Sequence, residues 1–238
     1  MVKSAWIFFV LATAVQANAQ GAKAASYPAM APVEQYRIAN RDEEIALARS
    51  AAPPSIAVDA EVLVLGSNGF ETAVKGKNGF TCIVERSWAT GFSDPEFWNP
   101  KLRAPNCFNA AARAVLAQYL KRTEWVLAGA TKQQMIDRTK AALADKTFAS
   151  PEPGAMCYML SAQGYLNDHD GHWMPHVMIY VPNAKAVSWG ANQKGSPINA
   201  FEGDELDPVS VFLIPVRHWS DGTAAPDHHA KQNNTNAG

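Results

Sequence analysis

The chain has 238 residues, of which 47% are hydrophobic and 18% are charged. These proportions are typical of a folded globular protein and exclude a disordered or low-complexity chain. The 21 basic and 22 acidic residues give a formal net charge of −1. This balance argues against a nucleic-acid-binding protein, which needs an excess of Lys and Arg to replace phosphate counterions. No apolar run reaches the length of about eighteen residues that a membrane-spanning helix needs.

The amino-terminal segment, residues 1–19, has the pattern of a secretory signal peptide. Lys3 precedes an apolar stretch over residues 5–15, and the small residues Ala17 and Ala19 follow two positions apart. As a helix the stretch would be about 16 Å long, against about 30 Å of membrane hydrocarbon, so it is too short to remain as an anchor. The alternative is an amino-terminal core helix, but no polar face interrupts the run. We therefore expect cleavage near Ala19 and a mature protein that is periplasmic or secreted.

Composition divides the mature chain into three parts. Residues 20–32 are rich in Ala, with Gly and Pro and no periodicity, and we expect a flexible lead-in there. Residues 33–220 carry the predicted helices and strands and are interpreted as a single globular domain; a division into two small domains near Asn106 is the alternative. Residues 221–238 are polar, and we expect a disordered tail.

The first elements of the domain are a helix and a group of strands. Residues 40–52 predict a helix, because Asn40 can cap it and Glu43 stands three residues later, as in a capping box. Pro53 ends this helix, since proline lacks the donor that a helix needs. Asn-Gly pairs, which favour tight hairpin turns, separate the strand candidates that follow. We therefore expect an antiparallel meander of three strands, at residues 61–65, 70–74 and 80–85.

The second half of the domain alternates between helices and strands. Residues 93–106 contain three prolines and predict an ordered loop. Helices are predicted over residues 110–128 and from Thr131, where Gln134 completes a capping box. Three more strands are predicted, at residues 155–161, 176–181 and 210–216. The pattern predicts an α+β fold, with an antiparallel sheet of about six strands and two to three helices.

The chain has three cysteines, Cys82, Cys107 and Cys157. In an oxidising compartment, an odd number predicts one disulfide and one free thiol, or a bond between two chains. Each of the three possible disulfides would stabilise the folded chain by about 3.5 to 4.5 kcal/mol through loop-closure entropy. These values are too similar to decide which two cysteines pair. If Asn106 caps the following helix, Cys107 lies in its first turn, where the helix dipole favours the reactive thiolate. If Asn109 caps it, Cys107 lies outside the helix, and the alternative role of Cys107 is a structural disulfide.

Three histidines, His169, His172 and His176, stand close together in the sequence. On a helix they would share a face and could bind zinc, but Gly171 and Pro175 disfavour a helix there. In a hairpin, His176 would lie about 13 Å along the strand from His172. These histidines are therefore weak candidates for a metal site, and the sequence implies no cofactor. His176 also begins an apolar strand, where it is either a general base that faces a pocket or a hydrogen-bonded core histidine.

Three segments, at residues 79–88, 96–100 and 153–158, resemble uncharacterised exported bacterial proteins. The likeness covers most of the mature chain. It implies bacterial export and implies no activity.

The order of a cysteine at a helix start and a later strand led by His176 is similar to the layout of NlpC/P60-type cell-wall peptidases. In that family, the cysteine attacks a peptide carbonyl and the histidine takes its proton, so the resemblance implies Cys107 as nucleophile and His176 as base. This chain departs from the family's Asp-Cys-Ser-Gly motif, since it has Asn-Cys-Phe-Asn at residues 106–109. Residues 186–189, where the third, orienting residue is expected, offer only Ser188.

Two functions follow as expectations. The first is an exported soluble domain without assignable catalysis, acting as a binding or envelope-associated module for a cell-envelope component or a small ligand. Trp98, Trp173 and Trp189 are its candidate binding residues, because tryptophan is favoured in binding pockets; the alternative is that they fill the core and the loops. The second function is a thiol hydrolase that uses Cys107 and His176 on a cell-wall peptide or a similar amide.

Overall fold

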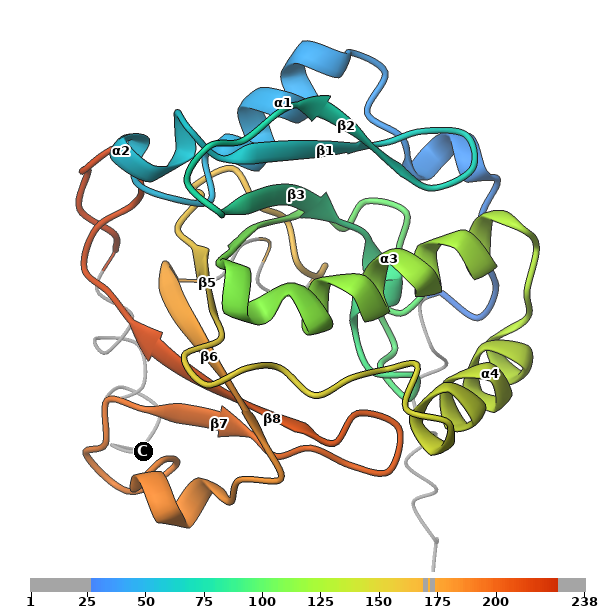
Figure 1. The fold of residues 1–238 in the computed structure, drawn as a ribbon. Helices are drawn as coiled ribbons and strands as arrows, with labels where there is room; N and C mark the ends of the chain where they lie inside the picture. Colours follow the sequence, from blue (N-terminus) through green and yellow to red (C-terminus); the bar gives the residue numbers. More distant parts are fainter. Residues whose placement is uncertain (1–26, 169–170, 172–173, 227–238) are drawn as a thin grey trace, which may run out of the picture.

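The computed structural model describes residues 27–168, 171 and 174–226 (Figure 1). The described α-helices are α1 (Arg41–Arg49), α2 (Pro54–Ala57), α3 (Arg113–Leu127) and α4 (Lys132–Ala144). The strands are β1 (Glu61–Leu65), β2 (Phe70–Val74), β3 (Thr81–Glu85), β4 (Ala104–Phe108), β5 (Met156–Met159), β6 (His176–Pro182), β7 (Asn199–Phe201) and β8 (Val209–Pro215). Short 3-10 helices are η1 (Val33–Tyr36), η2 (Ser87–Ala89), η3 (Ala110–Ala112) and η4 (Ala186–Trp189).

These eight strands belong to one sheet, in the order β2-β1-β3-β4-β5-β6-β8-β7. Neighbouring strands run antiparallel, except that β1 and β3 are parallel. The combination of helices and a largely antiparallel sheet agrees with the predicted α+β class. The predicted antiparallel sheet of about six strands is wrong in detail, because the sheet is larger and mixed.

The first three strands are not a meander. β1 and β2 form the predicted hairpin, with Leu65 opposite Phe70. β3 then pairs with the other side of β1, where Val62 lies beside Cys82. Burial explains this arrangement, since β1 and β3 are largely buried and β2 is partly exposed. Pairing β3 with β1 places both buried strands inside the sheet and leaves β2 at its edge.

The sequence did not predict two of the strands. β4 overlaps the predicted loop at residues 93–106 and contains Pro105, a residue type that normally argues against a central strand. All five residues of β4 are buried, so no alternation of polar and apolar residues marks the strand. β7 has only three residues. β4 lies between β3 and β5, so it joins the two halves of the sheet.

The helices begin at residues that provide side-chain caps. Asn40 accepts hydrogen bonds from two backbone N–H groups of α1, and Thr131 forms the predicted capping box with Gln134 at the start of α4. Asn109 caps the 3-10 turn that leads into α3. Asn106 lies inside β4 instead, so the chain adopts the second of the two caps that the sequence allowed.

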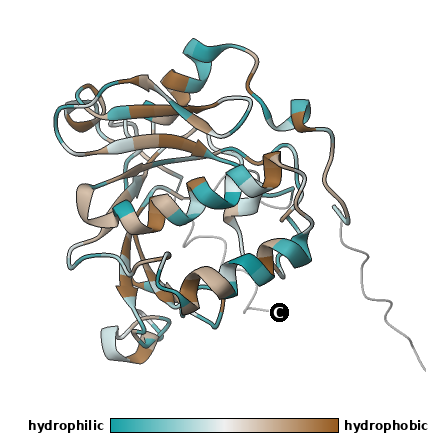
Figure 2. Cartoon of the chain, turned by 45° about the vertical axis from the view of Figure 1, so that its right-hand side comes forward, coloured by the Kyte–Doolittle hydropathy of each residue, from teal (hydrophilic) through white to brown (hydrophobic). Residues whose placement is uncertain are grey.

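Helices cover both faces of the sheet. α1 packs against β1, β3 and β4 on one face, over a core of small apolar residues. α3 and α4 lie on the other face, over a core rich in aromatic residues (Figure 1). Figure 2 shows hydrophobic and hydrophilic residues interspersed along α3 and α4, as expected of helices that bury one side against a sheet.

The described part of the chain leaves out the predicted signal peptide, part of the lead-in and most of the tail, which are residues 1–19, 20–26 and 227–238. Residues 27–32 contact the domain: the Tyr27 hydroxyl donates to Asp168, and the backbone N–H of Ala31 donates to the hydroxyl of Tyr36. Within the described residues, we find no helix with the length and apolar character needed to cross a membrane.

Candidate functional site

The cysteine expected to act as a nucleophile is bonded to a second cysteine. Cys107 lies in β4 opposite Cys82 of β3, and the two form a disulfide. Both are fully buried in the core between the sheet and α1. Of the two positions that the sequence allowed, Cys107 therefore occupies the one outside the helix. Because a disulfide has no thiolate, Cys107 in this state cannot attack a carbonyl.

The strand register also separates Cys107 from His176. Cys107 lies opposite Tyr158 of β5, and Tyr158 lies opposite Val177 of β6. Side chains of register partners share a face of the sheet, whereas neighbours along one strand point to opposite faces. His176 precedes Val177, so its side chain lies on the face opposite to that of Cys107. The structure does not form the catalytic pair that the hydrolase hypothesis requires, and we do not retain that hypothesis.

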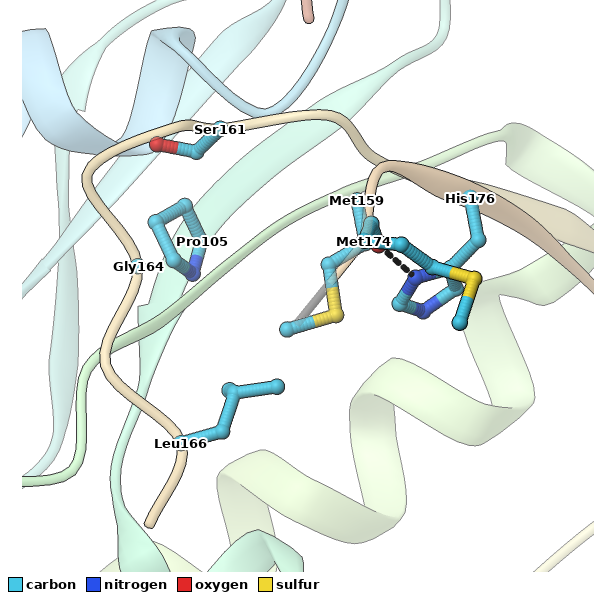
Figure 3. Close-up of a pocket in the computed structure, with 7 residues that line it drawn as sticks. All are labelled: Pro105, Met159, Ser161, Gly164, Leu166, Met174 and His176. Atoms are coloured by element: carbon cyan, nitrogen blue, oxygen red, sulfur yellow. Dashed lines mark hydrogen bonds between the residues drawn. The ribbon is translucent and has the colours of Figure 1, made fainter. Parts of the chain in front are cut away.

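His176 is a buried residue at the beginning of β6, with 2% of its surface exposed. Its Nδ1 lies 2.8 Å from the carbonyl oxygen of Met174, and burial lowers the pKa of the imidazole. The cavity beside it has a volume of about 10 Å³ (Figure 3), which is the space of about one water molecule. His169 and His172 lie outside the described residues, so the three-histidine cluster remains a prediction.

The candidate tryptophans do not form a groove in the described part of the chain. Trp98 is 5% exposed and belongs to the aromatic core beneath α3, where its ring meets the edge of Phe97. Trp189 is 38% exposed and stacks on Phe212 at a distance of 4.3 Å between ring centres. Trp98 therefore has the structural role that the sequence allowed as an alternative. Trp173 lies outside the described residues.

A connected group of polar side chains crosses the sheet on the face that α3 covers. Asn106 donates a hydrogen bond of 2.5 Å to the Oε2 of Glu85. The Sγ of Cys157 lies 3.5 Å from the Oδ1 of Asn106 and 3.1 Å from the hydroxyl oxygen of Tyr180. Burial raises the pKa of the Cys157 thiol. Cys157 is therefore a protonated, inert thiol at neutral pH.

Glu85 is the member of this group that changes charge near neutral pH. Burial raises the pKa of Glu85 to about 7, against the opposing effects of the Asn106 hydrogen bond and the positive charge of Arg122. Perturbed carboxylates of this kind are concentrated at functional sites, although structural networks also produce them. Glu85 and the nearby Arg122 therefore mark this region as a candidate site.

Arg122 lies on α3, near Glu85, and lines an open cleft. Its Nη1 donates to the carbonyl oxygens of Trp88 and Thr90, at 3.0 and 3.3 Å, and its guanidinium carbon lies 4.6 Å from the centre of the Phe92 ring. Its Nε is buried and has no hydrogen-bond partner in the described structure. The guanidinium is thus held in place on one side and keeps an unused donor, a combination that suits an anionic group of a ligand.

The cleft has a volume of about 400 Å³, which lies in the range of small-molecule sites. Its polar lining includes Arg122 and two carboxylates, Asp204 and Asp207, from the segment between β7 and β8. Thr90 and Ser93 add hydroxyl groups. The remaining side chains of the lining are apolar, and the largest of them are those of Phe92, Ile136 and Leu206. The cleft therefore presents both signs of charge next to an apolar wall.

Sequence reasoning did not find this cleft, because its residues are far apart in the chain. They come from the loop at residues 89–93, from α3, from α4 and from the segment at residues 204–207. Each of these stretches looks like an ordinary loop or helix surface in the sequence. The one usable signal was the acidic segment Asp204-Glu205-Leu206-Asp207, which by itself is a common kind of surface loop.

Comparisons of the chain with protein-family models, with curated proteins and with solved structures found no match. The geometry of the cleft is therefore the basis for assigning a function.

Proposed function

We propose that the protein is an exported binding module that holds a small zwitterionic ligand in the cleft lined by Arg122, Asp204 and Asp207. The ligand class follows from the charges. An anionic group would meet the guanidinium of Arg122, and an amine would meet the two carboxylates. The apolar wall suits an aliphatic or aromatic side chain, so a free amino acid or the end of a short peptide fits best.

The observation that carries this proposal is the coexistence of opposite charges in one cleft. Burial lowers the pKa of Arg122, against the opposing effect of the negative charges of Asp207 and Glu85, and an arginine remains charged under these conditions. The carboxylates are therefore close enough to Arg122 to act on it electrostatically, yet no direct ion pair joins them among the described residues. A zwitterion can satisfy both signs of charge at once.

The first test compares leucine with two analogues that each lack one charge. 4-Methylpentanoate keeps the carboxylate and lacks the amine, whereas isoamylamine keeps the amine and lacks the carboxylate. We expect calorimetric titration of the mature protein to show tighter binding of leucine than of either analogue. The proposal fails if leucine binds no better than both analogues.

A variant isolates the contribution of the carboxylates. Asp204 accepts hydrogen bonds from the backbone N–H groups of Leu206 and Asp207, at 2.7 and 2.9 Å, and asparagine keeps the oxygen that accepts them. Asp204→Asn with Asp207→Asn should therefore preserve the loop. It should weaken leucine binding by about tenfold or more, because a hydrogen bond to a charged group is worth about 1.5–3 kcal/mol.

The matched control is Glu205→Gln, which removes a charge from the same segment outside the cleft. It should leave leucine binding unchanged, and the double variant should leave the binding of 4-methylpentanoate unchanged. Equal affinity of the double variant and the unmodified protein for leucine would contradict the assignment of the amine to these carboxylates.

Export is the second part of the proposal. The leader pattern of residues 1–19 supports it, and so does the Cys82–Cys107 disulfide, because disulfides persist in oxidising compartments. Intact-mass measurement on protein from its native host should give a chain that begins near Gln20 and contains one disulfide. A chain that retains Met1 and has three reduced cysteines would contradict export.

A further inference from the structure

The carboxylate of Glu85 lies behind the wall of the cleft. Glu85 is the last residue of β3, and it shares a face of the sheet with Ile83, because side chains alternate along a strand. Ile83 belongs to the aromatic core beneath α3, so Glu85 faces the same helix that carries Arg122. After Glu85 the chain continues through η2 into the loop at residues 89–93, which lines the cleft.

Two side chains of α3 hold the segment that follows β3. The hydroxyl of Tyr119 accepts a hydrogen bond of 2.7 Å from the backbone N–H of Arg86, the first residue after the strand. One turn further along α3, the Nη1 of Arg122 donates to the carbonyl oxygens of Trp88 and Thr90, at 3.0 and 3.3 Å. The guanidinium therefore lines the cleft on one side and lies near the end of β3 on the other.

Glu85 and Arg122 act on each other electrostatically. The positive charge of Arg122 opposes the rise in the pKa of Glu85, and the negative charge of Glu85 opposes the fall in the pKa of Arg122. The hydrogen bond that Glu85 accepts from Asn106 comes from a neutral amide. Because burial raises the pKa of Glu85 to about 7, the negative charge behind Arg122 is present above this pH and absent below it.

The other titratable groups around Glu85 keep one charge state near neutral pH. Burial raises the pKa of three neutral neighbours from α3, β5 and β6, which are Tyr119, Cys157 and Tyr180, so they stay protonated. Arg122 keeps its positive charge. Arg86, the residue after Glu85, is paired with Glu44 of α1 at 2.7 Å. Within this described cluster, the group that titrates between pH 6 and pH 8 is therefore Glu85.

We propose that Glu85 is a proton-linked regulator of the cleft, because its negative charge and the anionic group of the ligand compete for Arg122. This inference rests on the proposed function, which brings a ligand carboxylate to the guanidinium. When Glu85 is protonated, Arg122 attracts the ligand carboxylate more strongly. By thermodynamic linkage, the bound ligand strengthens proton binding at Glu85 by the same factor. The protein thus holds its ligand in mildly acidic surroundings and releases it as the pH rises above about 7.

The test is calorimetric titration of the mature protein with leucine at pH 6, 7 and 8, a range in which leucine keeps both charges. Coupling between two sites is usually about fivefold or more. We therefore expect the affinity to fall by about threefold or more from pH 6 to pH 8. At pH 7, titrations in buffers of different ionisation enthalpy should show the uptake of about 0.3 proton per bound leucine. This second measurement needs no variant.

Glu85→Gln identifies the group that takes up the proton. Glutamine is neutral at every pH and keeps an oxygen that can accept from Asn106. The variant should bind leucine at pH 8 about as tightly as the unmodified protein does at pH 6, without proton uptake. Glu124→Gln, at an exposed position of the same helix as Arg122, is the matched control and should keep the dependence on pH. The proposal is overturned if Glu85→Gln keeps this dependence.

The direction of the change separates Glu85 from Asp207, whose pKa is also raised by burial. Protonation of Asp207 would remove a charge that faces the amine of the ligand, so it would weaken leucine binding as the pH falls. A leucine affinity that rises or stays constant from pH 6 to pH 8 would overturn the regulation by Glu85 and leave the proposed function intact. The absence of leucine binding at every pH would overturn both.

Discussion

Glu85 links the cleft to the interior of the sheet. It accepts a hydrogen bond from Asn106, and the positive charge of Arg122 acts on it. Burial raises the pKa of Glu85 to about 7, from an ordinary value of 4.5. Between these two pH values, the folded protein binds more protons than the unfolded chain. The contribution of Glu85 to stability is therefore present at low pH and is lost as the pH rises through about 7.

Glu85→Gln should remove this dependence on pH. Glutamine keeps an oxygen for Asn106 and has no charge to bury. Relative to the variant, the unmodified protein should lose up to about 3 kcal/mol of unfolding free energy between pH 4.5 and pH 8. Urea unfolding of both proteins across this range measures the difference. Glu124→Gln, at an exposed position of α3, is the control. A difference between Glu85→Gln and the unmodified protein that stays constant with pH would contradict the raised pKa of Glu85.

At the scale of elements, a buried ion pair attaches α1 to the sheet. Arg86 follows β3 and donates from Nη2 to the Oε1 of Glu44, in α1, at 2.7 Å. Its Nε also donates to the carbonyl of Tyr36, at 2.5 Å. The same Glu44 oxygen accepts the backbone N–H of Leu65, at 3.2 Å. One carboxylate thus joins α1 to both β1 and β3.

Glu44→Ala should destabilise the protein by about 3–5 kcal/mol, because it leaves the charge of Arg86 buried without a partner. Arg41→Ala, in the same helix, is the matched control, since Arg41 pairs with Glu71 at an exposed position. The loss of such a pair costs at most about 1 kcal/mol. Urea unfolding at pH 7 compares the two variants. Equal losses of unfolding free energy in the two variants would contradict the stabilising role of the buried Arg86–Glu44 pair.

The elements that the sequence predicted are those with local signals. The hairpin of β1 and β2 follows from an Asn-Gly turn between strand-forming residues, and the start of α4 follows from the Thr131–Gln134 capping box. β4 has no such signal, since it is buried on both sides and contains Pro105. The sequence also did not predict the parallel pairing of β1 with β3, because this pairing depends on how deeply each strand is buried and not on the turn between the strands.

At the scale of the whole molecule, the candidate site lay beyond sequence reasoning. Arg122 and Asp207 are 85 positions apart in the chain, and only the pairing of the strands and the packing of α3 bring them to one cleft. The Cys107–His176 pair illustrates the opposite case. The two residues occur in a suggestive order, but strand alternation places them on opposite faces of the sheet, and Cys82 is bonded to the cysteine.

The most direct test of the cleft is an NMR titration of ¹⁵N-labelled mature protein with leucine. The side-chain Nε–H of Arg122 reports the expected carboxylate contact, and the backbone amides of residues 89–93 and 204–207 report the rest of the lining. We predict saturable shifts of these signals together, with the same midpoint. Leucine that leaves the Arg122 Nε–H signal unmoved at saturation, or that shifts only signals elsewhere in the protein, would contradict the proposed binding site.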